Sequence, residues 1–357
     1  MPRLVSSSAQ FSSLSRRHWL GLLTAGAALS TLGVRAQTAP EQRKLALAVG
    51  GKTTLYYLPL TIAEQLGYFI DEGLQVELQD HAGGGLAQQS LLQGRADVAA
   101  GGFEHTILLR QRGYNCRAFA SLGRAPQLVF GINPRTLPEY RTLMQLKGRR
   151  IGISAPGSTT DWFARLLLTR AGVPIEAVEL VSVGTSTAAV NAMREARIDA
   201  IASIDPVISM LEFRGDIRVL ADTRSLRGTQ ELYGGPMPGG CLYAPQAFMV
   251  RYPNTVQALA NAMARALKWL QTAGPRDIVR AVPEAYMYGD RAVYLAAFDK
   301  MREALSPDGV LTDEAVAVAH RVVAQYAPGV TTPVRAQSPG ATYTNEFARR
   351  AKQKYQV

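Results

Sequence analysis

Two stretches place glycine or small hydroxyl residues at the start of an expected helix. Gly83–Gly85 precedes a helical run over 86–93, and Pro156–Thr160 leads into a second helix that starts at Ser158. Glycine lets a ligand approach the backbone, and a helix N-terminus carries about half a positive charge that favours anions. Serine and threonine there can cap the helix or hydrogen-bond an anion. Each stretch alone could be a cap and turn, but together they predict a site for an anionic group.

Further polar and aromatic residues stand at the ends of expected strands. Glu104 and His105 follow a glycine pair, where they could bind a polar ligand or simply begin a helix. Asp205 ends a strand, where its carboxylate could accept from a ligand amine or hydroxyl, or cap the next helix. Tyr56 and Tyr57 lie in a loop where they could wall a ligand. Open α/β sheets place ligands at this end of their strands.

Three familiar chemistries are excluded. Residues 46–53 fit a loose phosphate-loop pattern, but their first half is itself a strand and Pro59 delays the helix. Ser158 lacks the second glycine of a nucleophile elbow. The four histidines have no metal-site spacing. We therefore expect no catalytic residue, no metal and no cofactor.

The residues that flank these positions predict an α/β fold. Short apolar runs alternate with helical segments of about ten residues, which favours parallel sheets with helices on both faces. Two such units follow one another, and the segments 128–132 and 243–250 are expected to be extended and to carry the chain between them. The last third is predicted to be helical, and the tail from Thr331 has little periodicity, which predicts a surface location. One amphipathic stripe there consists of Val256, Leu259, Met263, Leu267 and Leu270.

Length and charge agree with two lobes and a small ligand. The chain has 357 residues, a mass of 38.6 kDa and a formal charge of +11. The first 36 residues hold four arginines and no acid, so the remainder carries +7. The basic residues are scattered, without the stripe that a nucleic-acid groove needs. We therefore expect no nucleic acid as a partner.

The N-terminus predicts export. Arg16 and Arg17 precede an uncharged stretch over 21–34, which is too short to span a bilayer comfortably, and small residues suit cleavage between Ala36 and Gln37. The arginine pair resembles a twin-arginine signal, which implies export in the folded state. No later segment is long and apolar enough for a stable membrane insertion. Cys116 and Cys241 could form one disulfide, but we expect two buried thiols.

An ordered set of short motifs resembles a known family. The motifs are Gly67-Tyr68-Phe69, Glu72-Gly73-Leu74, the glycine turn, Gln93-Gly94 with Asp97, Leu146–Gly152 and Ala155–Ser158. They resemble ABC-importer substrate-binding proteins of the nitrate, sulfonate and taurine type, from about Lys44 to about Leu270. The thiamine-pyrimidine family shares this pattern.

The resemblance implies a type II periplasmic binding protein fold, with two doubly wound lobes joined by two crossing strands. The expected parts are a signal peptide over 1–36, one lobe formed by 37–130 and 245–357, and the other by 131–244. The resemblance implies a monomeric periplasmic protein that captures a small organic ligand, carrying a sulfonate or carboxylate group, by hinge closure and delivers it to an ABC permease and its ATPase. The ligand-binding residues that the resemblance and the residue patterns indicate are Thr54, Tyr56, Tyr57, Gly84, Gly85, Glu104, His105, Thr106, Ser158, Thr159 and Asp205.

Three alternatives remain open at this point. The acidic pocket positions could instead mean a nitrogenous ligand, such as a pyrimidine precursor of thiamine. The protein could report to a membrane sensor and not to a transporter. An enzyme of the pyrimidine-synthase class is disfavoured because the chain has no cysteine cluster.

Overall fold

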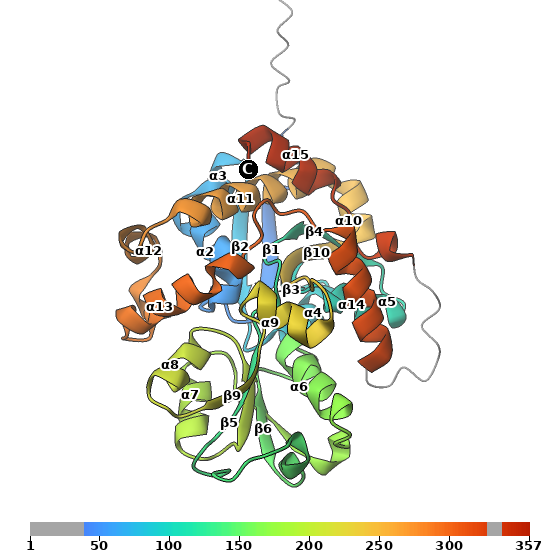
Figure 1. Cartoon of the computed structure of the whole chain (residues 1–357). Helices are drawn as coiled ribbons and strands as arrows, with labels where there is room; N and C mark the ends of the chain where they lie inside the picture. The colour runs from blue at the N-terminus through green and yellow to red at the C-terminus, as the bar shows by residue number, and fades with distance from the viewer. Residues whose placement is uncertain (1–38, 327–337) are drawn as a thin grey trace, which may run out of the picture. The chain divides into compact units, whose positions relative to one another are not determined.

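Two five-stranded sheets form the framework of the computed structural model, which describes residues 39–326 and 338–357 (Figure 1). Residues from Pro40 onward form one compact unit. The expected signal peptide and its cleavage site at Ala36 and Gln37 lie outside the described residues. Each sheet, taken with the helices that cover it, is called a lobe below.

The first sheet has the strand order β2-β1-β3-β10-β4. β1 pairs in parallel with β2 and β3, whereas β10 runs antiparallel to β3 and β4. All five residues of the central strand β3 are buried, as expected for a strand covered on both faces. The strands are β1 (Lys44–Val49), β2 (Gln75–Asp80), β3 (Val98–Gly102), β4 (Cys116–Ser121) and β10 (Gly240–Pro245), with helices α2 (Leu58–Gln65), α3 (Tyr68–Asp71), α4 (Gly84–Leu92) and α5 (Glu104–Gln111).

The second sheet repeats this plan with the order β7-β6-β8-β5-β9. β6 pairs in parallel with β7 and β8, and β5 runs antiparallel to β8 and β9. Its strands are β5 (Val129–Ile132), β6 (Arg150–Ile153), β7 (Glu179–Ser182), β8 (Ala200–Ser203) and β9 (Arg218–Asp222), with helices α6 (Thr159–Arg170), α7 (Thr187–Arg194), α8 (Val207–Phe213) and α9 (Leu226–Tyr233).

The α/β fold with two sheets covered by helices is confirmed, and the predicted parallel pairing holds for part of each sheet. Each sheet receives one antiparallel strand, β10 in the first and β5 in the second. These two strands pair with partners far away in the sequence, so local periodicity contains no signal for their direction.

The chain crosses between the sheets twice. It leaves the first sheet after β4 and returns before β10, and the two crossing segments are hydrogen-bonded where Gly239 N–H donates to Gly123 C=O at 2.9 Å. Residues 128–132 contain β5 as expected. The expectation of an extended segment over 243–250 is wrong beyond Pro245, because helix α10 (Gln246–Arg251) begins at the next residue. The lobe boundaries expected after residues 130 and 244 fall inside β5 and β10.

The last third is helical, as expected. Helix α11 (Pro253–Thr272) buries its predicted apolar stripe, and α12 (Pro275–Ala281), α13 (Arg291–Met301) and α14 (Asp313–Tyr326) follow. The described part of the tail is not a simple surface segment, because α15 (Glu346–Tyr355) packs along α11 and buries Phe347 (Figure 1). Its buried residues Phe347, Ala348 and Ala351 stand at helical spacing, a signal in the sequence that the prediction of a surface tail missed.

The C-terminal helices also contact the second lobe. α13 packs against α8, and α14 packs against both α5 and α6. Lys300 on α13 lies 3.2 Å from the Glu212 carboxylate on α8. Helices late in the sequence therefore bridge the two sheets beside the crossing segments.

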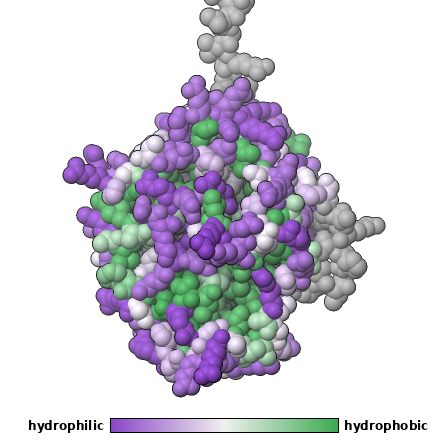
Figure 2. All heavy atoms as spheres, in the orientation of Figure 1, coloured by the Kyte–Doolittle hydropathy of each residue, from purple (hydrophilic) through white to green (hydrophobic). Residues whose placement is uncertain are grey.

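Most of the face drawn in Figure 2 is hydrophilic, with apolar residues gathered mainly in its lower half. The exposed large apolar residues include Ile70, Phe213 and Val250. Cys116 and Cys241 are buried free thiols, as expected. Among the helices of the described residues, none has the length and apolar character needed to cross a bilayer.

Candidate functional site

A small cavity lies between the two lobes. Its volume is about 20 Å³, room for one water molecule or two. Residues of both lobes line it, and five of the expected ligand-binding residues are among them. The lining comprises Gly50, Tyr56, Tyr57, Gly84, Leu128, Ser154, Ser158, Thr159, Thr160, Thr185 and Ile204.

Hydrogen bonds cross from one lobe to the other around this cavity. His105 Nε2 lies 3.4 Å from Thr159 Oγ1, and Leu55 N–H donates to the Asp205 carbonyl oxygen at 3.0 Å. Tyr288, before α13, contacts Thr53 Oγ1 with its hydroxyl at 2.6 Å and donates to the Thr185 carbonyl at 3.2 Å. The lobes are therefore joined on several sides of the cavity.

Glycines allow the loops of the two lobes to touch. A methyl group on Gly85 would overlap the Pro156 carbonyl, and one on Gly51 would overlap the Thr185 hydroxyl. A methyl group on Gly83 would lie 2.8 Å from the Ala155 side chain. The glycine turn thus has a structural requirement that the sequence alone did not reveal, because it packs directly against the loop before α6.

The second lobe contributes five hydroxyl residues to the lining, called the hydroxyl wall below: Ser154, Ser158, Thr159, Thr160 and Thr185. Ser158 caps α6, where its Oγ accepts from Asp161 N–H at 3.2 Å. Thr160 Oγ1 lies 2.8 Å from both Ser154 Oγ and Ser158 Oγ. These hydroxyls form a short chain at the N-terminus of a twelve-residue helix, an arrangement that suits an anionic group.

The first lobe contributes aromatic residues and a buried acid. The rings of Tyr56 and Tyr57 meet edge to face, with centroids 4.9 Å apart. Glu104 is 2% exposed and lies behind them, with its Oε1 3.6 Å from His105 Nε2. Burial lowers the pKa of His105, although the Glu104 carboxylate acts in the opposite direction. His105 is therefore neutral near pH 7, and its Nδ1 lies 3.3 Å from the Tyr243 hydroxyl.

Several expected ligand-binding residues have their polar groups occupied within their own lobe. Thr54 Oγ1 donates to the Gly51 carbonyl at 2.8 Å, and Thr106 Oγ1 donates to the Phe103 carbonyl at 2.8 Å. Neither residue lines the cavity, because each hydroxyl completes a local turn. Gly85 also lies outside the lining, since it packs against Pro156.

The Asp205 carboxylate serves the structure of the second lobe. It accepts from Ser209 N–H at 2.9 Å and lies 3.3 Å from an Arg224 nitrogen. Arg224, 1% exposed, also pairs with Glu212 and Asp222. Burial raises the pKa of Asp205, and Arg224 counteracts that rise. The side chain therefore caps α8 and balances a buried arginine, whereas its backbone carbonyl joins the lobes.

Other cavity residues were not identified from the sequence. Ser154 follows β6, Thr185 comes after β7 and Ile204 follows β8, so each lies at the carboxyl end of a strand. That position is a general signal for ligand sites, and it could have found them. Leu128, on a crossing segment, has no comparable signal.

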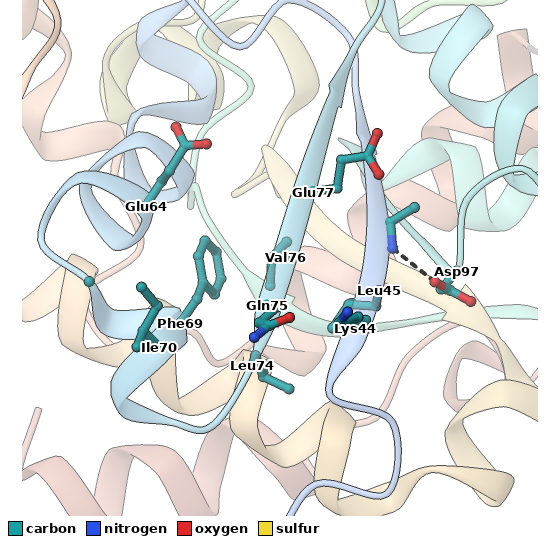
Figure 3. Close-up of a pocket in the computed structure, with 12 residues that line it drawn as sticks. Lys44, Leu45, Glu64, Phe69, Ile70, Leu74, Gln75, Val76, Glu77 and Asp97 are labelled. Carbon is teal, nitrogen blue, oxygen red and sulfur yellow. Dashed lines mark hydrogen bonds between the residues drawn. The ribbon is translucent and has the colours of Figure 1, made fainter.

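A larger cavity lies elsewhere, on the first lobe alone. It measures about 620 Å³ between β1, β2 and the helices α2 and α3. Figure 3 shows Phe69 beside Val76, and the Asp97 carboxylate accepting from the Ala46 backbone at 2.9 Å. The predicted ligand-binding residues do not line it. Among residues 39–326 and 338–357, no group of three or more acidic, histidine or cysteine side chains could hold a metal ion.

Proteins of known structure share this two-lobed architecture. A protein of Bordetella bronchiseptica RB50 is 48% identical, with a TM-score of 0.87, and the match covers 89% of this chain and 99% of that one. The periplasmic nitrate-binding protein NrtA of Synechocystis PCC 6803 is 15% identical, with a TM-score of 0.66 over 89% of this chain and 90% of that one. The alkanesulfonate-binding protein SsuA of Xanthomonas axonopodis pv. citri, bound to MOPS, is 18% identical, with a TM-score of 0.59 over 78% and 90%. The two distant likenesses establish the type II periplasmic binding protein fold.

A family profile matches most of the chain. The profile described as NMT1/THI5 like covers residues 54–273, which include the tyrosine loop, the glycine turn, the hydroxyl wall and both crossing segments. The matched residues include those of both lobes that line the cavity between the two mixed sheets. Because the profile covers more than half of the chain, this chain belongs to the NMT1/THI5 like family.

Proposed function

We propose that the protein is the solute-binding component of an ABC importer, which captures a small organic ligand between its lobes and delivers it to a membrane permease driven by a separate ATPase. The observation that carries this proposal is the ring of contacts across the cavity, above all His105 with Thr159 and Leu55 with Asp205. A ligand that contacts both lobes at once favours the closed form over an open one, in which it can contact only one lobe. The cavity has room for one water molecule or two, so the lobes must sit somewhat farther apart around an organic ligand. The permease then recognises the closed form.

The ligand carries an anionic group, a sulfonate or a carboxylate, at the hydroxyl wall. The cavity lining contains no lysine or arginine, so hydroxyls and helix amides must hold the anion. The N-termini of α4 and α6 both reach the cavity, through Gly84 and through Ser158 and Thr159. The similarity in fold to proteins named for nitrate and alkanesulfonate supports this ligand class.

The site of action is the periplasm. The twin-arginine pattern before Gln37 supports export, and the mature protein would act there as a monomer. No residue of the cavity lining is placed for covalent chemistry, and Ser158 is engaged as a helix cap. Capture therefore leaves the ligand unchanged.

The test is a thermal-shift panel on the mature chain from Gln37. Alkyl and aryl sulfonates, aromatic carboxylates, nitrate, pyrimidines and polyamines are each added, and bound ligand is then extracted for mass spectrometry. Binding only to the folded state at 100 times Kd stabilises by ~2.7 kcal/mol, a plain shift. We expect a sulfonate or carboxylate to shift the transition and to be recovered intact. A chemically altered ligand would overturn capture, and silence from every anion would overturn the ligand class.

The hydroxyl wall is tested with Thr159→Val. Ser158 is a poor target because its loss also removes a helix cap, worth ~1 kcal/mol of stability. Thr159 lacks that duty, so its replacement should weaken anion binding without weakening the fold. Gly340→Ala, at an exposed and uncrowded glycine, is the matched control.

A further inference from the structure

Among the residues that the structure describes, four buried polar atoms beside the cavity have no hydrogen-bond partner. They are the Tyr56 hydroxyl, Glu104 Oε1, the Trp162 indole nitrogen and the Tyr233 hydroxyl. The four residues are between 2% and 5% exposed. Buried polar atoms are usually paired, so unpaired ones at one place require an explanation.

These atoms come together from both lobes. Gly102 on β3 faces Gly240 on β10 in the sheet register. A methyl group on Gly240 would lie 2.9 Å from the Tyr56 ring, and one on Gly102 would overlap both the Glu104 carboxylate and Thr159 Oγ1. The two glycines thus leave a floor without side chains beneath Tyr56 and Glu104.

The second lobe closes the same space from the other side. Trp162 follows Thr159 by three residues on α6, so the two side chains share one face of the helix. The Trp162 ring stacks on Tyr233, with centroids 6.5 Å apart and an interplanar angle of 13°. Burial raises the pKa of both Tyr56 and Tyr233, and the Glu104 carboxylate raises both further, which agrees with its place among them.

The Glu104 carboxylate has no cation to balance it within this group. His105 Nε2, at 3.6 Å, is the nearest basic nitrogen that the contacts show, but burial lowers the pKa of His105 and keeps it neutral near pH 7. An isolated buried carboxylate is costly unless it is paired. A ligand that donates a hydrogen bond, and best one with a positive charge, would remove this cost.

We propose that Tyr56, Glu104, Trp162 and Tyr233 form a second subsite, the nitrogen subsite, which binds an ammonium or other N–H donor of the captured anion beside Thr159, at the edge of the hydroxyl wall. This inference rests on the proposed function. Glu104 accepts from the ligand nitrogen, and the aromatic rings surround it, as rings do for cations. Tyr56 and Thr159 connect the two subsites, because both line the cavity. The substrate class is therefore an organic anion that also carries an amine.

The first experiment needs no ligand. Glu104→Gln keeps the shape of the side chain and removes its unbalanced charge, so it should raise the unfolding temperature of the ligand-free protein. Tyr56→Phe and Tyr233→Phe each delete one unpaired hydroxyl and should do the same. Glu77→Gln, at an exposed acid on β2, should have no effect. A lower unfolding temperature in Glu104→Gln and in both phenylalanine variants would show that these groups are paired inside the protein, and would overturn the proposal.

The second experiment compares ligands in pairs that differ by the amine. Taurine is tested against ethanesulfonate, β-alanine against propanoate, and 4-(aminomethyl)benzoate against 4-methylbenzoate, by calorimetry on wild type, Glu104→Gln and Glu77→Gln. We expect an amine-bearing member to bind more tightly, and Glu104→Gln to erase that preference, a loss on the order of ten- to a hundred-fold for a charged hydrogen bond. Equal binding within every pair would overturn the nitrogen subsite and leave the anion site standing. No detectable binding of any of the six compounds would overturn both the nitrogen subsite and the proposed anion site.

Discussion

The backbone of Gly85 lies directly against the carbonyl group of Pro156, so that a single methyl group on Gly85 would overlap it. Gly85 is the second residue of α4 in the first lobe, and Pro156 belongs to the loop before α6 in the second. The two loops whose residue types predicted an anion site are therefore also the place where the lobes touch.

Gly85→Ala should prevent complete closure without harming the fold. The added methyl group meets the opposite lobe, and alanine favours α4, the helix in whose first turn Gly85 lies. We expect ligand affinity to fall at least about ten-fold, and the ligand-free unfolding free energy to change by less than ~1 kcal/mol. Isothermal calorimetry and urea unfolding measure the two quantities, with Gly340→Ala as the control. Unchanged affinity would show that the lobes bind ligand without this contact.

Thr159→Val should weaken the link between the lobes. The substitution keeps the side-chain shape but removes the hydroxyl that lies 3.4 Å from His105 Nε2. The loss of one neutral hydrogen bond costs ~0.5–1.5 kcal/mol, and most of it should fall on the closed form. We expect a shorter ligand residence time in stopped-flow measurements. Equal dissociation rates in wild type and variant would contradict this role.

Stability should decline as the pH falls below about 6.5, the ordinary pKa of histidine. Burial lowers the pKa of both His105 and His320, so in this range the unfolded chain binds more protons than the folded one. The stabilisation is fully present above the unfolded pKa and is lost as the pH falls toward the folded values. Urea unfolding at about pH 7.5 and about pH 5 should show the decline, and His105→Gln should make it shallower. An unaltered slope in that variant would assign the effect to other groups.

Arg224→Met should strongly destabilise the second lobe. The arginine is buried among Asp205, Glu212 and Asp222, and its removal leaves Asp205 buried without its cation. Breaking such a pair costs ~3–5 kcal/mol, whereas Arg227→Ala, at an exposed pair with Glu231, should leave the stability nearly unchanged. Thermal unfolding of the two variants gives the comparison. A small effect for both would mean that water reaches the Arg224 cluster.

Local patterns predicted the elements of this protein well, and predicted long-range placement poorly. The strand over 45–49, the cap at Ser158 and the stripe on α11 each follow from neighbours in the sequence. The direction of β10 depends on pairing with β3 and β4, more than a hundred residues earlier, and no local pattern encodes it.

The same contrast holds for the site. Tyr56, Tyr57, Gly84, Ser158 and Thr159 were expected and do line the cavity. Trp162 and Tyr233 of the proposed nitrogen subsite were not expected from the sequence, because their proximity to Glu104 arises only when the lobes meet. Asp205 was expected to bind ligand, but its carboxylate instead caps α8 and forms an ion pair with the buried Arg224.

The narrowness of the space between the lobes has a kinetic consequence. The space between the lobes encloses about 20 Å³ and the loops at Gly85 and Pro156 are in contact, so in the proposed capture mechanism the lobes must move apart before a ligand can enter or leave. In the proposed mechanism the lobes separate about the two crossing segments, which meet at Gly123 and Gly239. Ligands of quite different affinity would then share one upper limit on their dissociation rate, set by the rate at which the lobes open. Transfer to the permease would depend on whether that partner opens the lobes.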